Sequence, residues 1–129
     1  MYPYKKSYDH VLTMEKADHI ATITFDCPQN NNREGEQLLD EFSAALDTCH
    51  WDRDVRVIIL RGTGEVSFGP GDLSIIQTKL GKDLPSGREI MYEIANIIKK
   101  MYTIPQPIIG IADAGCVGGG CNLLLSSDI

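Results

Sequence analysis

Three consecutive glycines near the end of the chain constrain its fold more than any other feature. The segment 104–129 has the sequence IPQPIIGIADAGCVGGGCNLLLSSDI, which predicts an apolar strand, a short turn, the glycines 118–120 and then a helix. Glycine has no Cβ, so a ligand can approach the backbone of residues 118–120 closely. Free N–H groups at the start of a helix suit an oxyanion. The segment therefore predicts a backbone site for negative charge on a carbonyl oxygen, and the alternative is a glycine-rich turn without function.

Length and composition are those of an ordinary globular domain. The chain has 129 residues, which fits one domain, with 43% hydrophobic and 23% charged residues. Its net charge of −6 argues against nucleic acid or an anionic membrane surface as a partner, because both need a basic face. No apolar run is long enough to span a bilayer. Residues 1–10, MYPYKKSYDH, lack the apolar core of a signal peptide, so we expect a cytoplasmic protein.

Cysteine and histidine spacing predicts no metal site. There is no Cys-x-x-Cys pair and no histidine at zinc spacing near a cysteine. Without a secretion signal, we expect the four thiols to be reduced and partly buried. These cysteines are Cys27, Cys49, Cys116 and Cys121. The histidines His10, His19 and His50 are scattered and are expected at the surface or at helix ends.

Hydrophobic periodicity predicts alternating strands and helices in an α/β chain. The expected strands are 11–15, 20–25, 55–60 and 108–112, and the expected helices are 34–51, 86–103 and a short one from 121. Residues 16–19 are expected to close a hairpin, and residues 62–73 to form a loop. Ser86 and Glu89 are candidates for a capping box. The second helix is expected to turn six apolar residues inward: Ile90, Met91, Ile94, Ile97, Ile98 and Met101.

The acidic residues of the first predicted helix fall opposite its apolar face, which is expected to be buried and consists of Leu38, Leu39, Phe42, Ala45, Leu46 and Cys49. We therefore interpret them as a solvated face and not as a catalytic set. They are Glu34, Glu36, Asp40, Glu41 and Asp47.

Several motifs occur in the order found in the enoyl-CoA hydratase/isomerase (crotonase) superfamily, and the chain resembles that family from about His19 to Ile129. HIATITFDCP resembles its opening strand, with Asp26 and Cys27 in place of the usual Asn and Arg. DRDVRVIILRGTG, EVSFGPGDLSII and the segment 104–129 resemble its next strand and its two glycine segments. The resemblance implies an α/β fold, a crotonase-like ββα spiral that is truncated before its C-terminal half. Residues 1–129 would then be the N-terminal part of one domain.

The resemblance also implies a substrate and a site. The substrate would be an acyl thioester of coenzyme A, with no permanently bound cofactor. Its thioester carbonyl would lie between the backbone N–H groups of Gly71 and Gly119, which would stabilise an enolate-like oxyanion.

Further residues are matched to the acyl-CoA site through the same motifs. Asn32 falls on an asparagine that the family usually shows, and Asp72 and Leu73 follow the first glycine segment beside the expected ligand. Lys79 and Lys82 are candidate partners for the CoA phosphates, although ordinary solvated lysines are the more common case.

One position departs from the hydratase pattern. Hydratases of the family usually carry a glutamate where this chain has Asn122. An amide can hold a water or a substrate by hydrogen bonds, but unlike a carboxylate it does not take and return a proton near neutral pH. Asn122 therefore stays a candidate catalytic residue, and the reaction stays open among hydration, isomerisation, hydrolysis, decarboxylation and dehalogenation.

The chain stops at Ile129, where the family continues with further ββα turns and C-terminal helices. We therefore expect the chain to be a fragment of a longer enzyme, or to form half of a site that another chain completes. In either case, further structure would be needed to cover its apolar faces. For a full-length chain the resemblance implies a homo-oligomer, a trimer or a hexamer.

Two other functions are weighed against an acyl-CoA enzyme. A non-catalytic acyl-CoA binding or assembly subunit would keep the oxyanion site without its acid/base groups, as Asn122 suggests. A Clp-type protease has a related fold, but it needs a nucleophilic serine and a catalytic histidine. Ser67 has no nucleophile motif around it, and the histidines lie far from the glycine segments in sequence.

Overall fold

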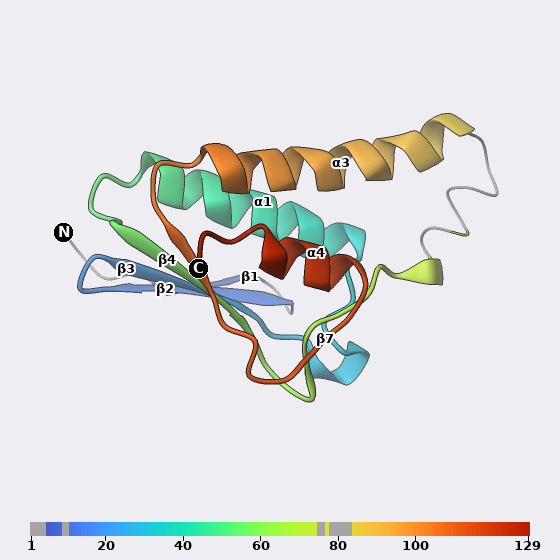
Figure 1. The fold of residues 1–129 in the computed structure, drawn as a ribbon, viewed down its shortest axis with the longest axis horizontal. Helices are drawn as coiled ribbons and strands as arrows, with labels where there is room; N and C mark the ends of the chain where they lie inside the picture. The colour runs from blue at the N-terminus through green and yellow to red at the C-terminus, as the bar shows by residue number, and fades with distance from the viewer. Residues whose placement is uncertain (1–4, 9–10, 75–76, 78–83) are drawn as a thin grey trace.

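A five-stranded sheet forms the base of the molecule. The computed structural model describes residues 5–8, 11–74, 77 and 84–129. The strand order is β1-β2-β3-β4-β6, antiparallel from β1 to β3 and parallel from β3 to β6 (Figure 1). The strands are β1 (Lys5–Tyr8), β2 (Leu12–Ala17), β3 (Ile20–Phe25), β4 (Val57–Gly62) and β6 (Ile108–Gly110).

The predicted hairpin between β2 and β3 is tighter than the sequence suggested. Lys16 pairs with Ala21 and Ala17 with Ile20, so only Asp18 and His19 form the turn. Both have positive φ, 50° and 67°, as a two-residue turn between twisted strands requires. Strand β1 was not predicted, because four residues carry too short a pattern to identify a strand.

Helix α1 (Glu36–Trp51) covers β2 and β3 with the face that its periodicity predicted. The ring of Phe25 lies edge-on to Phe42 at 5.2 Å and to Phe68 at 5.4 Å between centroids. Burying a ring of this size stabilises the fold by about 1.5–3 kcal/mol. The six buried residues of α1 are Leu38, Leu39, Phe42, Ala45, Leu46 and Cys49.

Helix α3 (Leu84–Thr103) packs on α1 as an outer layer, so a narrower stripe of it is buried than the sequence indicated (Figure 1). Ile90, Ile97 and Met101 are buried, but Met91 is 55% exposed, so its predicted inward position was wrong. The side chain of Ser86, in the candidate capping box, lies outside the described residues.

Strands β5 (Val66–Phe68) and β7 (Gly115–Cys116) pair in parallel as a second, two-stranded sheet. The sequence predicted only loop at both places, since neither strand is long enough to show alternation. Helix α4 (Gly119–Leu125) follows β7 and begins two residues earlier than predicted.

The last residues of the chain lie beside β6. The N–H of Asp128 donates to the carbonyl of Ile108 at 2.9 Å, and the N–H of Gly110 donates to the carbonyl of Ile129 at 2.8 Å. Strand β6 ends at Gly110, two residues before the end of the predicted strand 108–112, and Ile111 and Ala112 are exposed.

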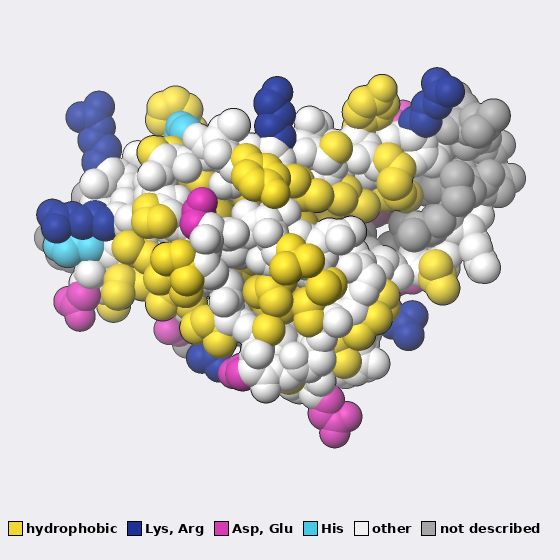
Figure 2. All heavy atoms as spheres, viewed as in Figure 1, with side chains coloured by type: hydrophobic (Ala, Val, Ile, Leu, Met, Phe, Trp, Pro, Cys, Tyr) yellow, Lys and Arg dark blue, Asp and Glu magenta, His cyan; other side chains and the backbone are white. Residues whose placement is uncertain are grey.

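Hydrophobic side chains are gathered along α3 and over α4 on the face seen in Figure 2. Large exposed apolar residues of these helices are Met91, Tyr92, Tyr102 and Leu125. No described helix is both long and apolar enough to cross a membrane.

Candidate functional site

Two glycine segments that are far apart in sequence lie side by side. Segment 68–71 begins at the last residue of β5 and segment 117–120 directly follows β7, so the pairing of these strands brings both segments to one place (Figure 1). The N–H of Val117 donates to the carbonyl of Phe68 at 2.9 Å, and the N–H of Gly120 donates to the carbonyl of Gly69 at 3.0 Å. The structure therefore brings together the segments that carry Gly71 and Gly119.

The glycines of the second segment are required by their surroundings. Gly118 has φ +57° and ψ −126°, a backbone conformation that residues other than glycine rarely adopt. A Cβ built on Gly119 would collide with a carboxylate oxygen of Glu34 and would lie 2.9 Å from Cδ of the same side chain. A Cβ at Gly120 would meet the backbone of Phe68 and Gly69, whereas one at Gly119 would have to displace the flexible carboxyl end of Glu34.

The backbone of Gly71 is held by a single bridge to Glu34. The N–H of Glu34 donates to the carbonyl of Pro70 at 2.9 Å, and the N–H of Asp72 donates to the carbonyl of Glu34 at 3.0 Å. In a parallel bridge of this kind the flanking residues make the bonds, so the N–H of Gly71 points away from Glu34's backbone. The N–H groups of Gly71 and Gly119 have no hydrogen-bond acceptor among the described residues.

Glu34 is a functional candidate that the sequence did not reveal. Helix α1 begins at Glu36, so Glu34 precedes it and is 7% exposed, and its assignment to a solvated helix face was wrong. Its Oε1 is buried without a hydrogen-bond partner among the described residues. Burial raises the pKa of this carboxyl from 4.5 to about 7. No periodic pattern could have identified it, because its burial comes from the 69–72 and 118–120 backbones.

A small cavity opens beside Glu34 and Gly71. Its volume of about 20 Å³ is enough for one water molecule and too small for an acyl chain. It lies between the start of α1, the loop after β5 and the first half of α3. Its lining is Glu34, Gly35, Glu36, Leu39, Gly71, Asp72, Ile90, Glu93 and Ile94.

Two thiols lie near the same carboxyl. Burial, a hydrogen bond with Cys121 and the charges of Cys121 and Glu34 raise the pKa of Cys116 to about 11. A thiol with such a pKa stays protonated at neutral pH and is a poor nucleophile. No group of three or more His, Cys, Asp or Glu side chains in the described part of the chain is placed to hold a metal ion.

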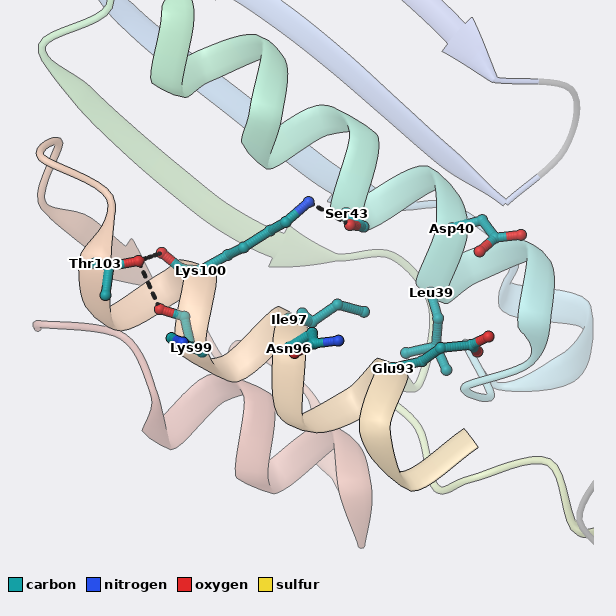
Figure 3. Close-up of a pocket in the computed structure, with 9 residues that line it drawn as sticks. All are labelled: Leu39, Asp40, Ser43, Glu93, Asn96, Ile97, Lys99, Lys100 and Thr103. Carbon is teal, nitrogen blue, oxygen red and sulfur yellow. Dashed lines mark hydrogen bonds between the residues drawn. The ribbon is translucent and has the colours of Figure 1, made fainter. Parts of the chain in front are cut away.

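A larger hollow lies elsewhere, in the groove between α1 and α3 (Figure 3). Its volume is about 430 Å³, and Lys100 of α3 reaches across it to Ser43 at 2.8 Å and to Asp47 at 2.7 Å. Leu39 and Glu93 line both this groove and the small cavity. The groove carries ordinary surface pairs, so its size alone does not make it the functional site.

Comparison with known proteins identifies the family. The family model for enoyl-CoA hydratase/isomerase matches residues 15–129. The chain belongs to this family. A crystal structure of an enoyl-CoA hydratase/carnithine racemase from Magnetospirillum magneticum has a TM-score of 0.87 at 26% identity, covering 97% of this chain and 46% of that one. The expected fold class is confirmed, and the described elements correspond to about half of the crotonase fold.

Relatives in this family differ in their named reactions. The 4-chlorobenzoyl coenzyme A dehalogenase-2 of Arthrobacter sp is 30% identical over 123 residues, covering 94% of this chain and 44% of the relative. The short-chain-enoyl-CoA hydratase of Clostridium acetobutylicum is 26% identical over 119 residues, covering 92% and 44%. The chain spans about half the length of the curated relatives it matches.

Asn32, matched to the acyl-CoA site through the family motif, is instead fully occupied with the protein. It is completely buried, and its Oδ1 accepts from the N–H of Cys27 at 2.8 Å. Its Nδ2 donates to the carbonyls of Thr63 and Val66, each at 2.8 Å, and its own carbonyl accepts from Gly69. The amide therefore ties the loop before α1 to the loop that leads to Gly71, with both of its polar side-chain atoms engaged by the protein and none exposed.

Asp72 and Leu73, the other two residues matched to the acyl-CoA site, directly follow Gly71 in the chain. Asp72 lines the small cavity, and its Oδ1 accepts from the N–H of Ser74 at 3.0 Å and from its hydroxyl at 2.6 Å. Leu73 is 62% exposed. Lys79 and Lys82, the candidate phosphate partners, lie outside the described residues.

Asn122 occupies the first turn of α4, at the position where the family's hydratases usually carry glutamate. Its side chain is exposed, and its carbonyl accepts from the hydroxyl of Ser126 at 2.8 Å. It is absent from the lining of the small cavity, which Glu34 and Gly71 share.

Proposed function

We propose that this chain forms the thioester-binding part of an acyl-CoA enzyme, with the thioester oxygen held by the N–H groups of Gly71 and Gly119. Family membership supports the substrate class. The single observation that carries the site is the joining of the two glycine segments through the 117–68 and 120–69 hydrogen bonds. Both N–H groups lack an acceptor among the described residues, so both are available to a ligand.

Two N–H donors placed in this way can stabilise negative charge on a thioester oxygen. Withdrawing a proton from the carbon next to a thioester places negative charge on the carbonyl oxygen. Two fixed N–H groups stabilise that charge without reorganising, and each donor of this type is worth about 2.7–4 kcal/mol at a transition state. The cavity beside Gly71 has a volume of about 20 Å³, and Ile90 and Ile94 of α3 are part of its lining.

The reaction that follows the enolate is not fixed by the glycines. Relatives named as a hydratase, a dehalogenase and a Delta(3,5)-Delta(2,4)-dienoyl-CoA isomerase share the family. Asn122 cannot act as the proton-transferring carboxylate that the hydratases place there. We therefore propose enolate formation as the common step and leave the product class open.

A non-catalytic acyl-CoA binding subunit is the second candidate. The amide at Asn122 favours it, because a site without a proton carrier can hold a thioester without turning it over. In either case we propose that the protein forms a homo-oligomer, on the family resemblance alone.

Calorimetry with two matched ligands tests the proposal. Butyryl-CoA has a thioester carbonyl, and S-butyl-CoA is a thioether without it. We expect the chain to bind butyryl-CoA more tightly by about tenfold or more, and in D₂O to exchange the α-protons of butyryl-CoA. Binding without exchange would favour the non-catalytic subunit. Equal affinity for the two ligands, or no binding of either, would contradict the carbonyl site.

A further inference from the structure

We propose that Glu34 is the proton-transferring residue of this site, because its buried carboxyl lies against Gly119 while its backbone bridges Gly71. This inference rests on the proposed function. Cδ of Glu34 lies 2.9 Å and Oε1 lies 3.3 Å from where a Cβ of Gly119 would stand. A ligand oxygen held by Gly71 and Gly119 would therefore have this carboxyl as its immediate neighbour.

A structural role does not account for Glu34. Buried polar groups in folded proteins are almost always hydrogen-bonded, since leaving one without a partner costs free energy. The buried amide of Asn32 follows this rule, with every polar atom engaged. Oε1 of Glu34 breaks it, although it is buried and lines the same cavity as Gly71. A buried carboxyl without a partner, in a cavity beside the two glycine segments, is therefore a candidate for proton transfer.

The charges around Glu34 favour a carboxyl that switches near neutral pH. The other charged residues that line the cavity are Glu36, Asp72 and Glu93, and the charge of Glu34 also acts on Cys116, which is hydrogen-bonded with Cys121. The described lining of the cavity contains no Lys or Arg, so nothing there holds the carboxyl ionised. Its pKa of about 7 lets it accept and return a proton at neutral pH.

The proposed step balances within the site. The ionised carboxylate of Glu34 takes a proton from the carbon next to the thioester carbonyl. The electron pair of the broken C–H bond forms a C=C bond, and the carbonyl π pair moves to oxygen, where Gly71 and Gly119 hold the charge. Return of a proton from the Glu34 carboxylic acid reverses the step. In D₂O the returned nucleus is deuterium, so each cycle labels the substrate.

The same carboxylate explains how a chain with Asn122 could still be catalytic. The amide at position 122 cannot carry the proton, and its exposed side chain does not line the cavity. Glu34 reaches the same glycine from the opposite segment, the loop before α1. The proton carrier would then come from the 32–35 loop instead of from α4.

Deuterium exchange into butyryl-CoA tests the role of Glu34 in the whole chain. Glu34→Gln keeps the size of the side chain and removes its proton chemistry, and Glu34→Asp keeps the carboxylate but retracts it. Glu65→Gln, at an exposed glutamate of the β4–β5 loop, is the matched control. We expect Glu34→Gln to lower the exchange rate by about 100-fold or more, with butyryl-CoA affinity within a few-fold of the parent chain. The control should exchange at the parent rate.

The pH profile separates a chemical role from a structural one. Exchange by the parent chain should rise as pH passes through about 7 and then level off, because the carboxylate is the active form. Glu34→Gln should lose this rise. Glu34→Asp should keep it at a lower rate, which shows that loss of activity does not come from loss of the fold.

Three results would overturn the inference in distinguishable ways. If Glu34→Gln exchanges at the parent rate, the proton carrier is another group and the carbonyl site stands. If Glu34→Gln exchanges faster or binds more tightly, the carboxyl obstructs the site instead of serving it. If the parent chain neither binds nor exchanges butyryl-CoA, the proposed function fails and this inference fails with it.

Discussion

Lys16 and Glu34 are both buried, yet their surroundings differ in the way that separates a structural charge from a functional one. No other Lys, Arg, Asp or Glu among the described residues is buried. Nζ of Lys16 lies 2.7 Å from a carboxylate oxygen of Asp52 and 3.4 Å from one of Asp54. Oε1 of Glu34 has no partner among the described residues.

The pKa values of the two carboxyl groups, Asp52 beside Lys16 and the unpaired Glu34, are shifted in opposite directions. The hydrogen bond from Lys16 holds the pKa of Asp52 below its ordinary value, and the hydrogen bond to Asp52 raises the pKa of Lys16. Each partner therefore favours the charged form of the other. Burial alone raises the pKa of Glu34, which favours its neutral form. A buried charged group that is paired with an opposite charge has a structural role, and a buried titratable group without a partner is available for chemistry.

The largest effect on stability is expected from Glu34→Gln at alkaline pH. The folded-state pKa of about 7 lies above the ordinary 4.5, so the folded chain binds this proton more tightly than the unfolded chain does. Stability from the neutral carboxyl is therefore full below pH 4.5 and is lost as pH rises through about 7. Glu34→Gln should match the parent at pH 4 and exceed it by up to roughly 3 kcal/mol at pH 8.5.

Urea unfolding at the two pH values measures this difference. Glu65→Gln, the exposed control, should stay within about 0.5 kcal/mol of the parent at both. A variant that gains nothing at pH 8.5 would show that Glu34 finds a partner when it ionises, and the contrast with Lys16 would disappear.

Gly119→Ala is expected to have the next largest effect, because the new methyl group would occupy the position of a Glu34 carboxylate oxygen. Overpacking of this kind costs about 1–3 kcal/mol. The displaced carboxyl should reach water, and its pKa should fall back toward 4.5.

A carboxyl ¹³C titration by NMR follows that pKa directly. Gly115→Ala is the control, since its added methyl group meets the carbonyl oxygen of Glu65 at 3.0 Å and does not touch Glu34. We expect the Glu34 signal to titrate near 7 in the parent and the control, and lower only in Gly119→Ala. An unchanged titration in Gly119→Ala would mean that burial of Glu34 does not depend on Gly119.

Long periodic segments were predicted well from the sequence. All six apolar residues assigned to the buried face of α1 are buried, and β3 has the predicted bounds 20–25. Sixteen helical residues repeat their pattern over several turns, so the period is unambiguous. Met91 shows the limit of the method: periodicity gives the apolar face of α3, but the width of its buried stripe depends on α1, its neighbour in space.

The site was predicted only in part, because two of its determinants are not local. The family resemblance pointed to Gly71 and Gly119 as candidate donors, and the structure places their segments together. The two segments are brought together by β5 and β7, which are three and two residues long and pair with each other. Strands this short leave no periodic pattern in the sequence. Glu34 looked like one more acid of a solvated helix face, since its burial is produced by backbone 85 positions further along the chain at Gly119. Asn32 matched a family position, but its role in holding the loop appears only when its four partners are seen.

Asp52→Asn should have a smaller effect, and one that depends on pH in the opposite sense to Glu34→Gln. The folded pKa of Asp52 is lowered, so its contribution is present above the ordinary value of 3.8 and is lost as pH falls through the folded value. The folded pKa of Lys16 is raised, so its contribution is present below 10.5 and is lost as pH rises beyond that. The variant should therefore be less stable than the parent at pH 7 and approach it at pH 2. A variant as stable as the parent at pH 7 would show that Asp54 alone satisfies Lys16.

The smallest effect is expected for Lys100, the cation that crosses the groove in Figure 3. Its Nζ lies 2.7 Å from Asp47, as close as Lys16 lies to Asp52, but the two side chains are 36% and 55% exposed. Water and salt screen such a pair, so a double-mutant cycle of Lys100→Met with Asp47→Asn should give a coupling of about 0.2–1 kcal/mol at low salt. That coupling should shrink in 1 M NaCl, whereas the coupling of Lys16 with Asp52, shielded from ions by burial, should change less. If both couplings respond equally to salt, the distance between the charges and not their burial sets the strength of the pair. Glu34 would then be distinguished from Lys16 by its missing partner alone.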